Sequence, residues 1–366
     1  MSEVRTSPAI DALAAGIVRD GVAPKAAAGW AARRADGQWE VSVGGATEAF
    51  FDLASLTKPL TAMSVARTPG LAGRSIGAVL PESAGSPSEA ATVEILLAHR
   101  AGLEANLPIY RPLVDGRTVD LTEALSEAAR ARRPDAKGPI PPGGFAPLYS
   151  DLGYILVGEA LARVHDDARD AGDVIAAKVI SPLGLAERLG SARSLEALGD
   201  RIRFGERVAS TEVVDWRGGE VRGLVHDENA FALRGAGACG HAGMFGTVSA
   251  VLAFGTAALD AITRGKGPLA IEEDLEWLVR TRQGGTLRAG FDGKSEGGTS
   301  TAGTLCGPRT FGHLGFTGTS LWIDPDAEAV VVLLTNRVHP TRDNGAIRAA
   351  RPVAHDALFA MAAKAG

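Results

Sequence analysis

The chain has 366 residues and a net charge of −5, with 45% hydrophobic and 22% charged residues. These values are typical of a soluble enzyme with one or two lobes, and the lack of a basic stripe argues against a nucleic-acid partner. No apolar run reaches membrane-spanning length, and the first residues lack the basic and apolar regions of a signal peptide. We therefore expect a cytoplasmic protein without a membrane partner, whose two cysteines stay reduced.

The N-terminal segment predicts a helix and then a β-hairpin. Apolar residues recur at helical spacing over residues 10–22. Two strand-like runs at 27–33 and 39–44 flank the turn-forming sequence Ala-Asp-Gly-Gln, which is the pattern of a hairpin. A second helix, which begins at Ser55 and ends near residues 68–70, follows.

From residue 71 to about residue 297 the pattern is mostly helical. Gly- and Pro-rich loops, including 138–147 and 234–246, separate the helical stretches. The stretches with helical spacing of apolar residues lie at 93–99, 121–132, 152–164 and 247–263.

The C-terminal segment returns to strands. Residues 316–323 and 329–334 predict two strands around an Asp-Pro-Asp turn, and the second has the valine-rich composition of a buried central strand. A helix over 347–363 closes the chain. This order predicts a split α/β (α+β) domain made of residues 1–54 and 298–366, and a mainly helical domain over 55–297. We expect the active site at their junction, where pockets tend to form.

Ser55-Leu-Thr-Lys58 is the one Ser-x-x-Lys sequence in the chain. If Ser55 caps a helix, Lys58 lies on the same face and its amine can reach the serine hydroxyl. A lysine kept neutral by burial can take the hydroxyl proton, and the helix N-terminus offers N–H groups to an oxyanion. The ordinary alternative, which is commoner for a lone match, is a capping serine followed by a surface lysine.

Tyr149-Ser-Asp151 is the second candidate element. Among the three tyrosines only Tyr149 has Asp or Asn two residues later, and it lies between a Pro/Gly-rich loop and a helix. A phenolate stabilised by a nearby ammonium can act as a general base and then as a general acid. The alternative is a tyrosine that fills a gap beneath the loop.

His313-Leu-Gly315 is the third element, at the predicted start of the strand 316–323. The glycine lets a substrate approach the backbone, and the strand edge can supply an oxyanion donor. Two similar sequences, at 241–243 and 364–366, do not precede a strand. The alternative is a turn histidine and glycine that open an ordinary strand.

In this order, the three elements resemble the motifs of the serine β-lactamase and penicillin-binding-protein superfamily. The tyrosine resembles the class C β-lactamase branch, with its family VIII-type esterase and D-aminopeptidase relatives. Flanking sequences at 95–103, 142–144 and 240–245 are similar too. The resemblance covers roughly residues 10 to 360 and implies a β-lactamase-like fold: an antiparallel sheet built from both chain ends and flanked by helices, plus a helical insertion.

The resemblance also implies roles. Ser55 would be the acylated nucleophile, and Lys58 and Tyr149 would share the general-base and general-acid work. The backbone N–H groups of Ser55 and Phe316 would form the oxyanion hole. His313 would take the position of the usual lysine, near a substrate carboxylate or the tyrosine.

Three residues depart from the family pattern. Asp151 replaces the usual Asn, so that it holds Lys58 charged and cannot donate to a substrate carbonyl. His313 replaces a lysine and Leu314 a threonine, so that a permanent charge and a hydroxyl are lost. These changes weaken the case for binding an anionic β-lactam and favour cleavage of an ester or a small amide.

Other functions stay open. A true β-lactamase, a D,D-peptidase or a D-aminopeptidase is one alternative, and a catalytically silent binding protein of the same fold is another. We expect no metal, because the spacing of His226, Asp227, Glu228 and His241 fits no tight ligand set, and we expect no other cofactor. The sequence leaves the oligomeric state open.

Overall fold

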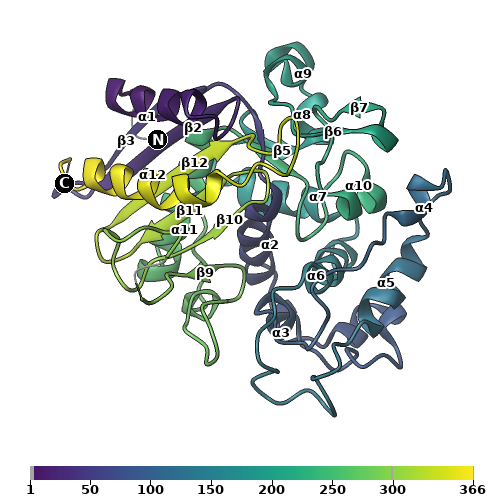
Figure 1. Ribbon diagram of the computed structural model, residues 1–366. Helices are drawn as coiled ribbons and strands as arrows, with labels where there is room; N and C mark the ends of the chain where they lie inside the picture. The colour runs from purple at the N-terminus through teal and green to yellow at the C-terminus, as the bar shows by residue number, and fades with distance from the viewer. Residues whose placement is uncertain (1–3, 298–299, 366) are drawn as a thin grey trace.

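A seven-stranded sheet brings the two ends of the chain together (Figure 1). The computed structural model describes residues 4–297 and 300–365. The strand order across the sheet is β1, β3, β2, β12, β11, β10 and β9. Their bounds are Val4–Thr6 (β1), Ala26–Arg33 (β2), Trp39–Gly45 (β3), Asp292–Gly293 (β9), Phe311–Leu314 (β10), Ser320–Asp324 (β11) and Ala329–Thr335 (β12).

The predicted hairpin and the predicted central strand are both confirmed. Strands β2 and β3 pair antiparallel, and β12 pairs with β2 in the middle of the sheet, with Val331 opposite Trp30. All seven residues of β12 are buried, as its valine-rich sequence indicates. The pairing of β1 with β3 is parallel, so the sheet is not antiparallel throughout.

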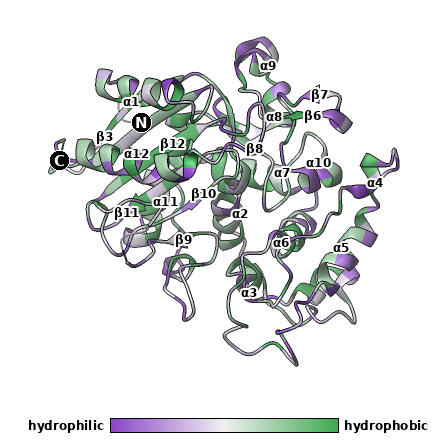
Figure 2. Cartoon of the chain, viewed as in Figure 1, coloured by the Kyte–Doolittle hydropathy of each residue, from purple (hydrophilic) through white to green (hydrophobic). Residues whose placement is uncertain are grey.

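Helices cover both faces of the sheet. Helices α1 (Pro8–Arg19) and α12 (Ile347–Ala362) pack on one face, and α11 (Val248–Arg264) packs on the other. The alternation along β12 shows this division, because Val331 and Leu333 join the core beneath α12 whereas Val330 and Val332 join the core beneath α11. Figure 2 shows hydrophobic colour on the central strand β12 and hydrophilic colour on the peripheral α9.

The remaining elements form a second, mainly helical region around a buried helix. Every residue of α2 (Thr57–Ala66) is buried, and this helix packs against α6 and α7. Small sheets order the loops between the helices. These elements are β4 (Phe51–Asp52), α3 (Val93–Leu97), α4 (Arg111–Val114), α5 (Leu121–Arg130), α6 (Asp151–Arg163), α7 (Ala171–Ile175), β5 (Leu189–Ser191), α8 (Ala192–Glu196), α9 (Phe204–Arg207), β6 (Val213–Val214), β7 (Gly219–Glu220), α10 (Glu228–Arg234) and β8 (Met244–Gly246).

Three predictions about the elements near the motifs are wrong. The sequence at 241–243 does precede a strand, because β8 follows it directly. Ser55 does not cap a helix, because it lies inside a short 3₁₀ turn, Ala54–Leu56, and Leu56 takes the cap position of α2. The strand predicted at 316–323 begins only at Ser320, and His313 lies within the preceding strand β10. Residues 315–319 therefore form the turn between β10 and β11.

The proposed division of the chain at residues 54/55 and 297/298 stays a prediction. Both α11 and β9 lie between these boundaries and nevertheless belong to the layers of the large sheet. Within the described part of the chain, no helix has both the length and the apolar character that crossing a membrane requires.

Candidate active site

The turn that carries Ser55 is held in an unusual backbone conformation. Ala54 has a φ of +47°, in the left-handed region that residues with a Cβ rarely adopt. The buried carboxylate of Asp52 accepts a hydrogen bond from the backbone N–H of Ala54 over 2.7 Å. This bond fixes the turn, and Ser55 emerges half-buried at the start of α2.

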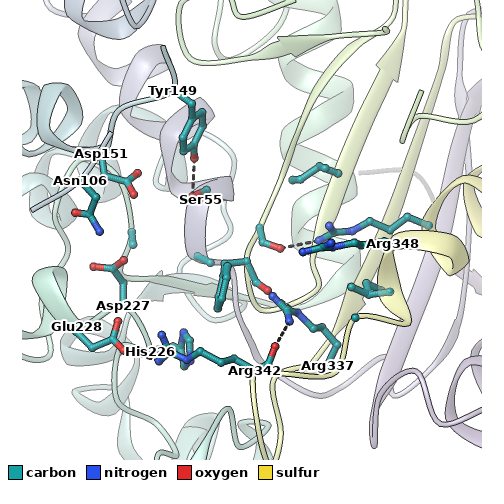
Figure 3. A pocket seen from close by; sticks show the side chains of 18 of the residues that line it. Ser55, Asn106, Tyr149, Asp151, His226, Asp227, Glu228, Arg337, Arg342 and Arg348 are labelled. Carbon is teal, nitrogen blue, oxygen red and sulfur yellow. Dashed lines mark hydrogen bonds and ion pairs between the residues drawn. The ribbon is translucent and has the colours of Figure 1, made fainter. Parts of the chain in front are cut away.

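Two of the predicted partners meet at the Ser55 hydroxyl. The ammonium of Lys58 donates to Ser55 Oγ over 3.0 Å. The phenol of Tyr149 donates to the same oxygen over 2.8 Å (Figure 3). Tyr149 lies 94 residues along the chain from Ser55, so only the fold brings them together. The arrangement places a nucleophile between two groups that can exchange protons with it.

Asp151 keeps Lys58 charged. The Lys58 side chain is fully buried, and its Nζ donates to Asp151 Oδ1 over 2.7 Å. Burial disfavours the ammonium, but the charge and the hydrogen bond of Asp151 oppose this effect, and the pKa of Lys58 is raised. Lys58 is therefore an ammonium at neutral pH. The Ser-x-x-Lys motif is also compatible with a neutral lysine that acts as a base, but this is not the resting state of Lys58.

The Tyr149 phenol is protonated in the same state. Burial raises the pKa of Tyr149 above its ordinary value of 10.0, although the nearby Lys58 ammonium works in the opposite direction. The ring of His99 stacks on the Tyr149 ring with centroids 4.7 Å apart. His99 is held in turn by the N–H of Ser150, which donates to its Nδ1 over 3.0 Å.

His99 is a supporting residue that sequence reasoning missed as part of the site. Burial, followed by the charge of Lys58, lowers its pKa well below 6.5, so that the ring is neutral. In the sequence, His99 lies at the end of a short apolar helix, and this position alone does not indicate a role in the site.

His313 lies beside Tyr149 and carries no charge at neutral pH. Its ring centroid is 5.9 Å from that of Tyr149, and its Nδ1 donates to the carbonyl oxygen of Leu314 over 2.8 Å. Burial and the Lys58 ammonium lower its pKa to about 3. His313 therefore does not restore the positive charge of the lysine that it replaces.

Gly315 and Phe316 form the turn next to the nucleophile. A Cβ at Gly315 would collide with Thr319 Oγ1 and would lie 2.6 Å from Leu53 O, so only glycine fits. The Phe316 side chain is half exposed, stacks on His226 at 5.8 Å and lies 4.5 Å beneath the Arg337 guanidinium. Arg337 Nε also donates to Phe316 O over 2.9 Å, which fixes this backbone segment.

A pocket of about 490 Å³ opens in front of Ser55. Figure 3 shows its side chains converging from several elements. It is lined by Ala54, Ser55, Asn106, Tyr149, Asp151, His226, Asp227, Glu228, Ala242, Leu314, Gly315, Phe316, Arg337, Arg342, Asp343, Gly345, Ile347, Arg348 and Arg351.

Sequence reasoning missed the four arginines of this pocket, namely Arg337, Arg342, Arg348 and Arg351. All follow the central strand β12 within 16 residues of it, and this density of arginine after a buried strand was an available signal. Arg351 donates to the carbonyl oxygens of Gly315 over 2.6 Å and Thr319 over 2.9 Å, which also holds the Phe316 turn.

The histidines that raised the question of a metal each pair with a carboxylate. His226 Nε2 lies 3.0 Å from Glu212, and His241 Nε2 lies 2.8 Å from Asp227. Over residues 4–297 and 300–365, no three His, Cys, Asp or Glu side chains gather as a metal site would require.

Known proteins resemble this chain in sequence and in fold. The family model described as "Beta-lactamase" matches residues 2–355. A protein of Escherichia coli (strain K12), provisionally named a D-alanyl-D-alanine carboxypeptidase, is 26% identical over 329 residues, which are 84% of this chain and 74% of that protein. The matches in similarly named proteins of Escherichia coli O157:H7 and Salmonella agona (strain SL483) span 46% and 56% of those proteins.

Solved structures share the fold at low sequence identity. EstCE1, described as a hydrolase with promiscuous acyltransferase activity, superposes with a TM-score of 0.67 at 20% identity and covers 96% of this chain and 97% of its own. A class C β-lactamase from Rhodobacter sphaeroides has a TM-score of 0.64 at 16% identity, with 97% and 99% coverage. With a family model that spans nearly the whole chain and this shared fold, the protein belongs to the Beta-lactamase family and is a serine hydrolase.

Proposed function

We propose that the protein cleaves a small ester or amide through an acyl-enzyme formed on Ser55. The observation that carries this proposal is the double contact at the nucleophile, where Lys58 and Tyr149 both donate to Ser55 Oγ at the edge of the pocket. The intact set of three residues argues against a silent binding protein of the same fold.

Tyr149 is the proposed general base and general acid. In its phenolate form it takes the Ser55 proton as Oγ attacks the substrate carbonyl carbon, and the bond to the leaving group then breaks as Tyr149 returns the proton to that group. Water hydrolyses the resulting ester by the reverse route and frees Ser55. The Lys58 ammonium stays charged throughout and stabilises the phenolate.

The backbone N–H groups of Ser55 and Phe316 are the proposed oxyanion hole. Both residues line the pocket, and the contacts from Asp52, Arg337 and Arg351 hold the two backbone segments in place. Such fixed donors stabilise the developing oxyanion because they need no reorganisation during the reaction.

Two candidate substrate types follow from different walls of the pocket. Asp151, His313 and Leu314 favour an ester or small amide over a β-lactam, as the sequence predicts. Arg337 and Arg348 favour a second candidate, a β-lactam or a D,D-peptide, because their guanidinium groups line the pocket and are able to pair with a carboxylate. We place the activity in a reducing compartment such as the cytoplasm, in keeping with two buried cysteines that form no disulfide.

The test uses an activated phosphonate and three substrates. Wild-type protein should gain the mass of one phosphonyl group and should cleave p-nitrophenyl butyrate, whereas Ser55→Ala should lose both reactions. A chromogenic cephalosporin and a D-alanyl anilide distinguish the alternatives, because we expect the ester to have the largest kcat/KM. Labelling of Ser75 or Ser295 instead of Ser55 would contradict the assignment of the nucleophile.

A further inference from the structure

The pocket in front of Ser55 has a wall of carboxylates with free oxygens. Asp151, Asp227 and Glu228 line the pocket, and their side chains are 21%, 28% and 19% exposed. Each carboxylate has one oxygen in contact with a basic side chain, and the other oxygen accepts no hydrogen bond from any residue that the structure describes. Asp151 and Glu228 form ion pairs with Lys58 and Arg342, and Asp227 accepts a hydrogen bond from His241.

Asp227 is the best placed of the three to receive a cation. Its Oδ1 accepts from His241 Nε2 and from the N–H of Ala230, both over 2.8 Å, which fixes the direction of the free Oδ2. Burial disfavours its charge, but His241 outweighs that effect and lowers the pKa of Asp227, so that the carboxylate is ionised at neutral pH. Beside it, Arg342 is shared between Glu228 and Glu212, and Glu212 also contacts His226.

The other wall carries guanidinium groups that meet no carboxylate. Among residues 4–297 and 300–365, the Arg348 side chain makes no hydrogen bond or ion pair. Within the same described ranges, the Arg337 side chain donates to the carbonyl oxygens of Phe316, Arg342 and Asn344 and pairs with no carboxylate. Asp343 also lines the pocket, but it is exposed and accepts from the Thr341 hydroxyl.

Ser55 lies between the two walls. Figure 3 shows Asp151, Asp227 and Glu228 on one side of Ser55, and Arg337 and Arg348 on the other. A ligand that spans this pocket therefore meets negative charge at one end, the nucleophile in the middle and positive charge at the far end. The volume of about 490 Å³ is within the usual range of roughly 300–1,000 Å³ for small-molecule sites.

We propose that the substrate is an unblocked dipeptide, bound with its ammonium group against Asp227 and Glu228 and its carboxylate against Arg348 and Arg337. The inference rests on the proposed acyl-enzyme function at Ser55. A dipeptide has opposite charges on the two sides of one scissile amide, as this pocket requires. An N-acylated peptide would place an uncharged group against the carboxylates. The carboxylates would then lose their hydrating water without gaining a cationic partner, which is unfavourable.

The reaction follows the proposed mechanism. Ser55 Oγ forms a bond to the peptide carbonyl carbon, and the C–N bond breaks as Tyr149 gives the serine proton to the departing amine. The C-terminal amino acid leaves first. Water then cleaves the ester, which releases the N-terminal amino acid and restores the Ser55 hydroxyl.

The test compares four forms of alanyl-alanine as both the all-L and the all-D isomer: unblocked, N-acetylated, C-amidated and doubly blocked. Release of alanine or alanine amide is measured by mass spectrometry with the wild-type protein. We expect the unblocked form of the preferred isomer to have a kcat/KM about ten- to a hundredfold above each singly blocked form. Equal or faster cleavage of the N-acetylated form would overturn the proposal.

Two variants test which wall of the pocket binds the ammonium group of the dipeptide and which wall binds its carboxylate. Arg348→Gln should lower kcat/KM for the unblocked and N-acetylated forms but not for the amides, and Asp227→Asn should affect only substrates with a free ammonium. Arg130→Gln, on α5 and outside the pocket, is the matched control. A uniform loss over all four substrates would contradict the assignment, and the wild-type comparison remains decisive if Asp227→Asn does not fold.

Ester hydrolysis distinguishes the proposed acyl-enzyme function from the proposed dipeptide substrate. If Ser55-dependent cleavage of p-nitrophenyl butyrate and phosphonate labelling occur but no dipeptide is cleaved, the substrate class is wrong and the acyl-enzyme function stands. If neither the ester nor the phosphonate reacts at Ser55, the acyl-enzyme function itself fails.

Discussion

At the scale of single residues, the proposed mechanism depends on the phenol oxygen of Tyr149. It donates to Ser55 Oγ over 2.8 Å, and its pKa is raised by burial. Tyr149→Phe keeps the ring that stacks on His99 and removes only the oxygen. We expect kcat for ester hydrolysis to fall about a hundredfold or more, as for loss of a general base, with an unchanged melting temperature. Wild-type kcat at every pH would transfer the general-base role to Lys58.

The charge of Asp151 sets the pH at which Tyr149 becomes a base. Because the Tyr149 pKa lies above 10.0, the phenolate fraction and therefore kcat/KM should rise with pH through the neutral and alkaline range. Asp151 contributes to that raised pKa by charge repulsion. Asp151→Asn removes this repulsion, lowers the pKa of Tyr149 and should move the rising limb of the pH–rate profile to lower pH. A limb that stays in place or moves to higher pH would show that Tyr149 ionisation does not control the rate.

At the residue scale, the local motifs were enough to predict Ser55, Lys58 and Tyr149, which the structure brings together. The charged walls of the pocket were not predictable in that way. Asp227 and Arg348 are 121 positions apart, and no spacing rule connects them. They line the same pocket only because the segment after β12 returns to it beside the start of α10.

At the element scale, Asp52 joins three chain segments around the nucleophile. Its two carboxylate oxygens accept from the N–H groups of Ala54 and His226 over 2.7 and 2.8 Å, and its carbonyl oxygen accepts from the Thr317 hydroxyl over 2.7 Å. Asp52→Ala should lower the free energy of unfolding by about 2–5 kcal/mol, because two buried N–H groups lose their acceptor at roughly 1–3 kcal/mol each. The turn at Ala54 should relax as well, so that kcat falls more than KM changes.

Chemical denaturation and ester kinetics measure these two effects. Thr317→Val is the matched control, since it removes the third contact and leaves both carboxylate bonds in place. Asp52→Asn retains one acceptor oxygen and should recover part of the loss. If Asp52→Ala changed neither stability nor kcat, the turn would be fixed by its neighbours alone.

The elements that were predicted correctly are those with long or strongly patterned sequences, such as the β2–β3 hairpin and β12. Strand β10 was missed because it has only four residues, and the following Gly315-Phe-Thr-Gly318 sequence folds as a turn. The predicted helix cap at Ser55 is wrong because the conformation of Ala54 depends on a contact with the Asp52 carboxylate, which helix signals do not encode. Local pattern therefore specified most of the scaffold, whereas tertiary contacts specified the turns that carry the site.

At the scale of the whole molecule, Glu212 links distant parts of the chain and makes stability sensitive to acid. It contacts His226 at 3.0 Å and Arg342 at 2.6 Å. Burial raises its pKa, but the hydrogen bonds from His226 and Arg342 outweigh this effect and lower the pKa from 4.5 to about 2. The unfolded chain therefore takes up the proton first as the pH falls from about 4.5 to about 2, and stability decreases over that range.

Glu212→Gln removes this titration. The variant should be less stable than the wild type at neutral pH, and its melting temperature should fall less steeply between pH 4.5 and 2. Thermal unfolding followed by circular dichroism over that range measures both slopes. Glu206→Gln, on the exposed surface, is the control, and parallel slopes for wild type and Glu212→Gln would contradict the assignment.

The pairing of β2 with β12 has a consequence for biosynthesis. The ribosome completes the strand that ends at Arg33 some 300 residues before it delivers the partner that begins at Ala329. Throughout that interval the alanine-rich β2 has one unpaired edge, a state that invites association with other nascent chains. A message that is cut short before codon 329 leaves that edge open and also omits Arg337 and Arg348. Truncated products should therefore be both aggregation-prone and inactive, although they contain Ser55, Lys58 and Tyr149.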